Sequence, residues 1–257
     1  ILERTKRKLP RGTAEPHINK LSVTQLSSYL DSPYLFYLRH ILGLKDIDTN
    51  YEEINPLHYG TFAHAIIEAF SDSEKKNSRD SKEIRDTLND IIAIKQEQKF
   101  PFCNSIQKAQ INLLKKRLAP FCSKQAQLNS EGWQIWKSEW ILPEGLRLFD
   151  SPFTITGTID RIDINDDTAR IIDFKTSKSS EEYKVKNVFK QNSWKNLQLP
   201  LYALMCKELP DFKDKKIEIA YFPISEKINE TALINLPWGE QEQNTAQEQI
   251  KKIIGSI

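Results

Sequence analysis

The chain has 257 residues, of which 39% are hydrophobic and 28% charged, and its formal net charge at pH 7 is +2. This balance is that of an ordinary soluble globular protein, and the length allows one substantial domain with extensions. No apolar run reaches the roughly 20 residues that a transmembrane helix needs, so we expect no contact with a membrane.

Residues 1 to 20 are expected to form a basic arm ahead of a folded domain at 21 to 257. The first residues contain no apolar core of the kind found in a signal peptide, which predicts a cytoplasmic protein. The only methionine is Met205, so we expect the chain to be a piece of a longer protein. The basic residues of the arm are Arg4, Lys6, Arg7, Lys8 and Arg11.

Short helices are expected first in the folded domain. Ser22 and Gln25 have the spacing of a capping box, in which each side chain caps the other's backbone N–H at a helix start. Pro33 suits the first position of a second helix, and Gly43 can end it. A third helix carries His64 among apolar neighbours and should pack against a sheet.

Two longer helices are expected in an insert of about residues 71 to 130. Apolar residues recur at helical spacing over roughly 82 to 99 and 105 to 128. Pro101 separates the two segments.

Strands become frequent after this insert. Alternating apolar and polar residues begin at Trp133, and a helix is expected at about 197 to 209. A strand at 217 to 222 should end at Pro223. A Gln-rich helix of about 240 to 254 comes last, and the order of elements predicts one compact α/β unit.

One predicted hairpin carries side chains that could catalyse a reaction. Short β-branched runs, with the sequences GTIDRID from residue 157 and IIDFKT from residue 171, flank a turn at 165 to 167. The hairpin brings Asp160 and Asp173 together, and two hard oxygen ligands suit Mg²⁺ or Mn²⁺. Lys175 projects from the same strand face as Asp173, where it can hold a water and a phosphate oxygen. The pattern indicates a metal-dependent phosphodiesterase.

This pattern resembles the PD-(D/E)XK nuclease superfamily. His64 in GTFAHAIIE, together with Gln198 and Tyr202 in a Q-x-x-x-Y motif, is similar to its RecB-like branch, and the motifs occur in that family's order. The stretches LSVTQL from residue 21 and SPYLFYLRHILGL from residue 32 resemble the nuclease domain of AddB-type double-strand-break repair proteins. The resemblance covers roughly residues 21 to 225, and it implies a central mixed β-sheet flanked by helices.

The resemblance also implies a set of metal ligands. Asp160, Asp173, the backbone carbonyl of Phe174 and the imidazole of His64 would hold Mg²⁺, with Mn²⁺ as a substitute. Glu139, on a strand ahead of the hairpin, is an additional acidic candidate.

The same resemblance assigns roles around the metal. Lys175 would orient the attacking water and stabilise charge on the phosphoryl oxygens. Gln198 and Tyr202 would position the scissile strand or tune Lys175. Glu68 and Asp163 are expected to be structural.

Other cofactors are not expected. The wide and irregular spacing of Cys103, Cys122 and Cys206 argues against zinc, a disulfide framework or a redox pair. Some RecB-like relatives hold an iron–sulfur cluster through a cysteine just before the residue matched by Pro33, and this chain has Ser32 there, so we expect no cluster. The chain has no G-x-x-x-x-G-K-[ST] phosphate loop, so we expect no ATP site.

Lysines gather between the D-x-K strand and the Gln198 helix, as binding of a polyanion predicts. Trp194 in the same segment could stack on an unpaired base, or it could anchor the core. Lysines also solvate ordinary helix faces, so both interpretations stay open. The basic arm or the helix over 108 to 124 is an alternative DNA path. The candidate DNA-binding residues are Lys178, Lys184, Lys186, Lys190 and Trp194.

These features predict a metal-dependent DNA nuclease, an exonuclease by resemblance, that processes broken DNA ends. Its partner would be a helicase subunit or a missing N-terminal helicase-like region. The polarity of cutting and the choice between exonuclease and endonuclease action stay open. One alternative is a catalytically silent nuclease-fold module that binds DNA, and another is a structural domain of a helicase–nuclease complex. The presence of His64, Asp173 and Lys175 favours the catalytic interpretation.

Overall fold

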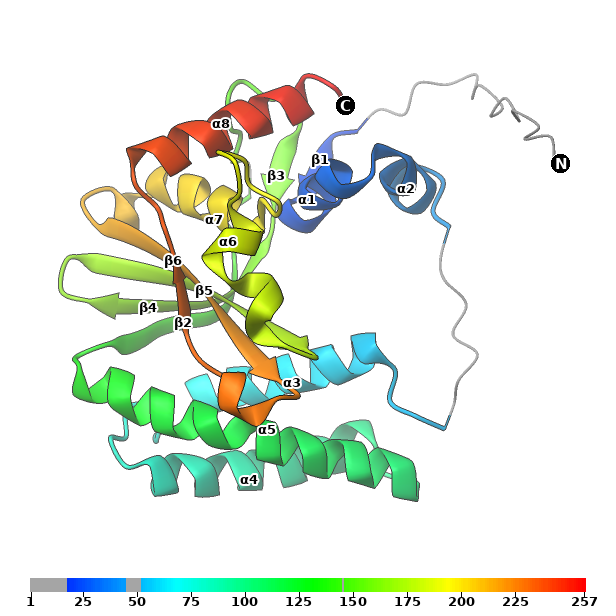
Figure 1. The fold of residues 1–257 in the computed structure, drawn as a ribbon, viewed down its shortest axis with the longest axis vertical. Coiled ribbons are helices and arrows are strands. Elements are labelled where there is room, and N and C mark those ends of the chain that lie inside the picture. The colour runs from blue at the N-terminus through cyan, green and yellow to red at the C-terminus, as the bar shows by residue number, and fades with distance from the viewer. Residues whose placement is uncertain (1–17, 45–51, 145) are drawn as a thin grey trace, which may run out of the picture.

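The computed structural model describes residues 18 to 44, 52 to 144 and 146 to 257 (Figure 1). Residues 1 to 17 of the predicted basic arm, with all the basic side chains named for it, lie outside the described residues, whereas Lys20 begins β1. Within the described ranges, no helix combines the length and the apolar character that crossing a bilayer requires.

Helices fill most of the described chain up to Ser130, and strands and helices both occur after it. The helices are α1 (Val23–Asp31), α2 (Pro33–Phe36), α3 (Pro56–Ser71), α4 (Ser81–Lys99), α5 (Ser105–Ser130), α6 (Val185–Val188), α7 (Gln198–Lys207) and α8 (Glu240–Ile254). The strands are β1 (Lys20–Ser22), β2 (Gln134–Ile141), β3 (Thr154–Thr156), β4 (Thr158–Asn165), β5 (Thr168–Ser177), β6 (Lys216–Ser225) and β7 (Ile234–Leu236). Single helical turns of other types lie at Tyr37–Ile41, Ser180–Tyr183, Pro210–Phe212 and Ile228–Glu230.

The main sheet has five strands in the order β2-β4-β5-β6-β7. β5 and β6 are parallel, whereas the other neighbours are antiparallel, so the sheet is mixed. β1 and β3 form a separate parallel pair. This arrangement confirms the predicted α/β class with a central mixed sheet.

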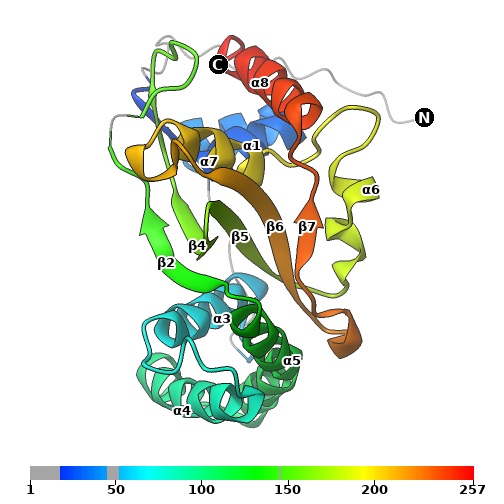
Figure 2. The same cartoon turned by 90° about the vertical axis from the view of Figure 1, so that its left-hand side faces the viewer.

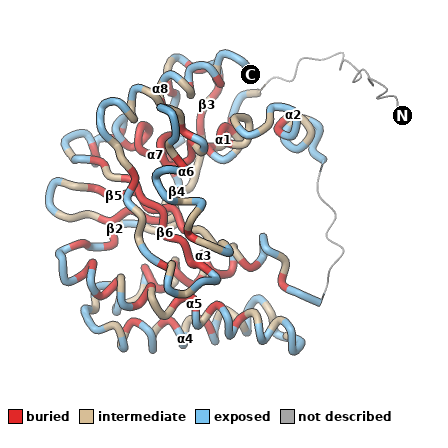
Figure 3. Tube along the Cα trace, viewed as in Figure 1, coloured by how far each residue is buried: buried red, intermediate tan, exposed pale blue. Residues whose placement is uncertain are grey.

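Helices cover both faces of the main sheet (Figure 2). On one face lie α3, α4 and α5, where the apolar core includes Phe121, Phe174 and Phe222. On the other face lie α1, α7 and α8, where the core includes Ile159 and Leu199. The buried residues follow the sheet and the inner sides of these helices (Figure 3).

Local sequence explains where the helices begin. Ser22 and Gln25 form the predicted capping box of α1, and Pro33 lies in the first turn of α2. The side chain of Asn55 caps α3, with Pro56 in the first turn. The two long helices predicted from apolar periodicity are present as α4 and α5.

The prediction that Pro223 ends a strand is wrong. β6 continues to Ser225 and pairs with β5 over its whole length, with Lys175 opposite Pro223. The pairing with β7 covers only Ile219 to Tyr221, so among the described strands β6 has β5 alone as its neighbour at Pro223. A proline without a backbone N–H is tolerated at such an edge position.

β4 and β5 form the predicted hairpin. Its turn places Asp166 in the left-handed backbone region, with φ of 47°, which aspartate adopts more readily than most residues. The ladder between the two strands extends as far as Arg161 and Ile172. Asp160 and Asp173 are the next residues on their strands, so the fold brings both carboxylates to the end of this ladder.

Candidate functional site

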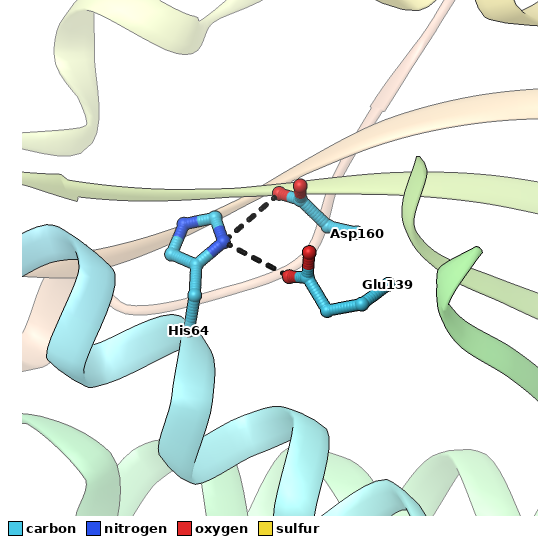
Figure 4. Close-up of side chains that lie close together, drawn as sticks. All are labelled: His64, Glu139 and Asp160. Atoms are coloured by element: carbon cyan, nitrogen blue, oxygen red, sulfur yellow. Dashed lines mark ion pairs between the residues drawn. The ribbon is translucent and has the colours of Figure 1, made fainter. Parts of the chain in front are cut away.

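Three side chains from three elements converge at one point beside the sheet (Figure 4). They are His64 of α3, Glu139 of β2 and Asp160 of β4, and one ligand atom of each lies within 4.8 Å of the others. The Nδ1 atom of His64 is 3.5 Å from Glu139 Oε1 and 3.6 Å from Asp160 Oδ2. The three residues are partly buried, so the group is sheltered but open to an ion.

The main chain of Phe174 orients this cluster. Its N–H donates to Asp160 Oδ2 at 2.7 Å, and its carbonyl oxygen lies 3.1 Å from His64 Nε2. Because a carbonyl oxygen only accepts, Nε2 must carry the proton of that bond. In the neutral imidazole the lone pair is then on Nδ1, which faces the two carboxylates, and this pattern is typical of a metal-binding histidine held by a backbone carbonyl.

The environment of the cluster raises the pKa values of Asp160 and His64. Burial, reinforced by the charge of Asp173, raises the pKa of Asp160 to about 7, although His64 and the Phe174 N–H oppose the shift. Burial lowers the pKa of His64, but the contact with Glu139 and the negative charges around it outweigh burial, so the pKa is raised above 6.5. A cation entering the site must therefore displace protons near neutral pH.

Asp173 and Lys175 form a second group on β5. Lys175 Nζ lies 2.6 Å from Asp173 Oδ2 and donates a hydrogen bond of 3.1 Å to Gln198 Oε1 on α7. Asp173 is 2% exposed, and its Oδ2 accepts no hydrogen bond of normal geometry from the described residues. The structure thus brings Asp173, Lys175 and Gln198 together, but it does not place Asp173 within the compact three-residue cluster.

Tyr202 braces the start of β4. Its hydroxyl donates to the carbonyl of Thr158 at 2.7 Å, two residues before Asp160. A Cβ on Gly157 would lie 2.8 Å from the Tyr202 ring, so only glycine leaves room for the tyrosine. Tyr202 contacts the backbone that presents Asp160, and its predicted contact with the scissile strand stays a prediction.

Glu139 is more central than its place in the sequence indicates. Ser138 pairs with Arg161 and Trp140 with Ile159, so the antiparallel register places Glu139 across from Asp160. Glu139 also has a φ of 43°, a strained backbone that clusters at functional sites. The sequence shows only that Glu139 is an acidic residue on a strand before the hairpin. Its position beside Asp160 follows from the register of β2 against β4.

Two acidic residues for which the sequence predicts structural roles lie outside the cluster. Asp163 is fully buried and accepts two hydrogen bonds, of 2.6 and 2.7 Å, from the buried guanidinium of Arg161. Glu68 lies one turn beyond His64 on α3 and lines the same groove without joining the cluster.

The predicted stacking of Trp194 on an unpaired base is wrong. Trp194 is 1% exposed and packs between Phe189 and Trp238, and its indole N–H donates to the Glu242 carbonyl. The alternative interpretation, a core anchor, is confirmed.

The candidate DNA-binding lysines form no single isolated basic surface. Lys184 and Lys186 both pair with Glu181, and Lys178 lines a hollow that Glu181 and Glu182 share. DNA binding by these lysines and by Lys190 stays a prediction.

A groove of about 540 Å³ leads to the cluster. Its walls come from the outer side of α3, the end of α4 and β2. The residues that matter here are His64, Glu68, Lys99 and Glu139. The groove gives an extended ligand access to the cluster from solvent.

Two of the curated relatives share the name of a subunit of an ATP-dependent helicase/deoxyribonuclease. The chain is 24% identical to this protein of Streptococcus mutans over 241 residues, which are 85% of this chain and 20% of that protein. It is 25% identical over 234 residues to the protein of the same name from Clostridium acetobutylicum, covering 81% of this chain and 20% of the relative. The chain therefore spans about a fifth of the length of these relatives.

Two further comparisons concern the fold and the family. A protein of Eubacterium rectale described as a candidate exonuclease has a similar fold, with a TM-score of 0.52, 10% identity, and coverage of 93% of this chain and 82% of that chain. The model of the PD-(D/E)XK nuclease superfamily matches residues 20 to 256. That match includes the three-residue cluster, the Asp173–Lys175 pair and the Gln198 helix, so the chain belongs to the PD-(D/E)XK nuclease superfamily.

Proposed function

We propose that this chain hydrolyses phosphodiester bonds of DNA with Mg²⁺, for which Mn²⁺ can substitute. The observation that carries the proposal is the convergence of His64, Glu139 and Asp160 within 4.8 Å, beside the Asp173–Lys175 pair. The names of the relatives, which include deoxyribonuclease, support DNA as the substrate.

The residues fit a hard divalent cation. Two carboxylates and one imidazole suit Mg²⁺ and Mn²⁺, and no thiolate is among them. Asp173 Oδ2 lies 2.6 Å from the Lys175 ammonium in this conformation, and its role as a further metal ligand is proposed from the match to the nuclease family. The Phe174 carbonyl orients His64 in this conformation, and its direct ligation stays a proposal.

Each residue then has a defined task. When bound, a divalent cation supplies Lewis-acid chemistry at a phosphoryl oxygen and acidifies a water. Lys175, positioned by Gln198 and paired with Asp173, places a positive charge where the phosphoryl oxygens gain charge. Tyr202 holds the backbone from which Asp160 projects.

We further propose that the chain is the nuclease part of a larger helicase–nuclease assembly that processes DNA ends in the bacterial cytoplasm. The support is the name of relatives of which the chain covers one fifth. The helicase partner would supply unwound strands.

The test is incubation of the purified chain with end-labelled single- and double-stranded DNA in Mg²⁺, Mn²⁺ or chelator. We expect metal-dependent products, whose lengths give the polarity and the mode of cutting. Asp160→Asn should be inactive, whereas Glu68→Gln, a change in the same groove outside the cluster, should cut like the parent. Activity that survives chelation, or that survives Asp160→Asn, would refute the proposed site.

A further inference from the structure

A second cavity, of about 330 Å³, lies at the end of β5. It begins at Thr176, the residue that follows Lys175 on the strand. Its other walls come from α3, α5, the residues Glu53 and Ile54 ahead of α3, and Glu226 after β6. The lining residues used below are Tyr59, Gln110, Arg117, Thr176, Lys178 and Glu226.

Two residues that line this cavity each carry a buried polar atom without a partner among the described residues. The two atoms are the hydroxyl of Tyr59 and the Nε atom of Arg117, on side chains that are 9% and 5% exposed. A neighbouring polar group is fully paired, because the Gln110 amide bonds both the N–H and the carbonyl of Ile54, at 2.8 and 3.0 Å. A buried unpaired donor is costly unless a ligand or a water accepts its hydrogen bond.

Inside the cavity, the carboxylate of Glu226 pairs with the guanidinium of Arg117. Arg117 Nη2 lies 2.9 Å from Glu226 Oε1, and the guanidinium stacks 5.2 Å from the centre of the Tyr59 ring. The Glu226 side chain is 49% exposed, so it can swing into solvent, whereas Arg117 is fixed by its packing. Burial raises the pKa of Tyr59, so the phenol keeps its proton and can donate it.

We propose that Arg117 and Tyr59 form a phosphate subsite for the nucleotide next to the scissile phosphate, with Glu226 replacing that phosphate in the free protein. The inference rests on the proposed nuclease function. Its ligand must accept hydrogen bonds from two donors and carry negative charge, and a phosphate does both. A strand rises about 3.3 Å per residue, so the backbone from Thr176 to Lys178 lies within roughly 10 Å of that of Lys175. Thr176 faces the side of the sheet opposite Lys175, so a DNA strand that reaches both must pass around the end of β5. Lys178 adds a second positive charge to the lining, which also contains the carboxylates of Glu53 and Glu226.

The first test removes a single oxygen atom. Tyr59→Phe deletes only the unpaired hydroxyl, so the thermal midpoint of unfolding should stay the same or rise. Affinity for a fluorescent single strand, measured by anisotropy in chelator, should fall roughly five- to thirty-fold. Tyr29→Phe is the matched control, because the Tyr29 hydroxyl bonds the Ser256 carbonyl outside this cavity. Equal affinities for Tyr59→Phe and Tyr29→Phe would overturn the proposal.

Glu226→Gln tests the exchange of anions. The change keeps the shape of the side chain and removes the charge that competes for Arg117, so strand affinity should rise several-fold. Lower or unchanged affinity would show that Glu226 does not occupy a phosphate position.

A neutral linkage locates the subsite. One methylphosphonate is moved along the strand, and cleavage should fall most when it adjoins the scissile bond. This position should matter less in Tyr59→Phe, and an equal effect in both proteins would contradict the assignment. The proposal expects Tyr59→Phe to lose affinity for strands with a 5′-hydroxyl, because the subsite binds an internal phosphate. A loss of affinity confined to 5′-phosphorylated strands would contradict it and assign the subsite to the strand end. If the parent cuts no strand, the proposed nuclease function fails, while the anisotropy comparison still decides the subsite.

Discussion

Lys175 holds its ammonium group 2.6 Å from the carboxylate of Asp173, two residues earlier on β5. Alternate residues of a strand share a face, so Asp173 and Lys175 place a negative and a positive group side by side on one face of β5. Gln198 reaches the same ammonium from α7 and limits its movement. Mutating each residue in turn can therefore distinguish the role of the negative group from that of the positive group.

Lys175→Ala should keep the metal and lose the rate. The ammonium stabilises charge that develops in the transition state, so we expect kcat to fall by about 10²-fold or more with Mn²⁺ affinity nearly unchanged. Asp173→Ala should abolish cleavage and weaken Mn²⁺ binding, with DNA binding retained. Calorimetric Mn²⁺ titration separates the two, and loss of Mn²⁺ in the lysine variant would reassign Lys175.

Asp160→Asn should stabilise the metal-free chain at pH 8. The fold raises the pKa of Asp160 to about 7, so ionising it costs stability as the pH rises from about 4 through 7. Asparagine removes that cost and still offers an acceptor to the Phe174 N–H. We expect a gain of about 1–3 kcal/mol at pH 8 in chelator, and none near pH 4. Denaturant unfolding at both pH values checks this, and an equal gain at pH 4 would contradict the electrostatic cause.

His64 and Glu139 should both contribute to Mn²⁺ affinity. The raised pKa values of His64 and Asp160 mean that protons compete with the metal, so affinity should fall as the pH drops below about 7. His64→Ala and Glu139→Gln should weaken binding at pH 7.5, and His64→Ala should flatten the acid limb. Glu68→Gln is the control on the same helix, and an equal affinity for it and Glu139→Gln would remove Glu139 from the site.

The salt dependence of DNA affinity should show whether the lysines after β5 contact phosphates. If Lys178, Lys186 and Lys190 contact phosphates, the logarithm of affinity for a single strand should fall with the logarithm of salt by roughly 0.7 per contact. Replacing all three by Gln should flatten the slope and lower affinity on every sequence alike.

The control for that experiment is a lysine set at the opposite end of the sheet. Lys207, Lys213 and Lys216 are exposed and lie near the start of β6, away from the Asp173–Lys175 pair. Their replacement by Gln should leave the slope unchanged. Equal slopes for both triple variants would show that the lysines after β5 only solvate the surface.

Trp194→Ala should act on stability. Removal of a fully buried indole leaves a cavity between Phe189 and Trp238, and such changes cost about 3–5 kcal/mol. DNA affinity per folded molecule should not change. A stable variant with weakened DNA binding, seen by unfolding and anisotropy together, would restore the stacking interpretation.

The local elements and the main motif follow from the sequence alone. Capping at Ser22 and apolar periodicity in the two long helices act over a few residues, so both can be predicted from the sequence. The β4–β5 hairpin is also local, because a short turn sets its register. The proximity of Asp160, Asp173 and Lys175 is therefore predictable from the sequence, with the mixed sheet implied by resemblance.

Features that depend on distant partners required the assembled fold. Glu139 joins His64 and Asp160 because β2 pairs with β4 in one register. Neither this register, which shifts between Ile135 and Lys137, nor the positive φ of Glu139 is visible in the sequence. Trp194 is buried because α8 supplies the Glu242 carbonyl to its indole. Arg117 lies in a basic stretch of the sequence, yet packing against Tyr59 removes it from the surface. Burial and long-range register are properties of the packed layers, because the environment of each element is set by the neighbours against which it packs.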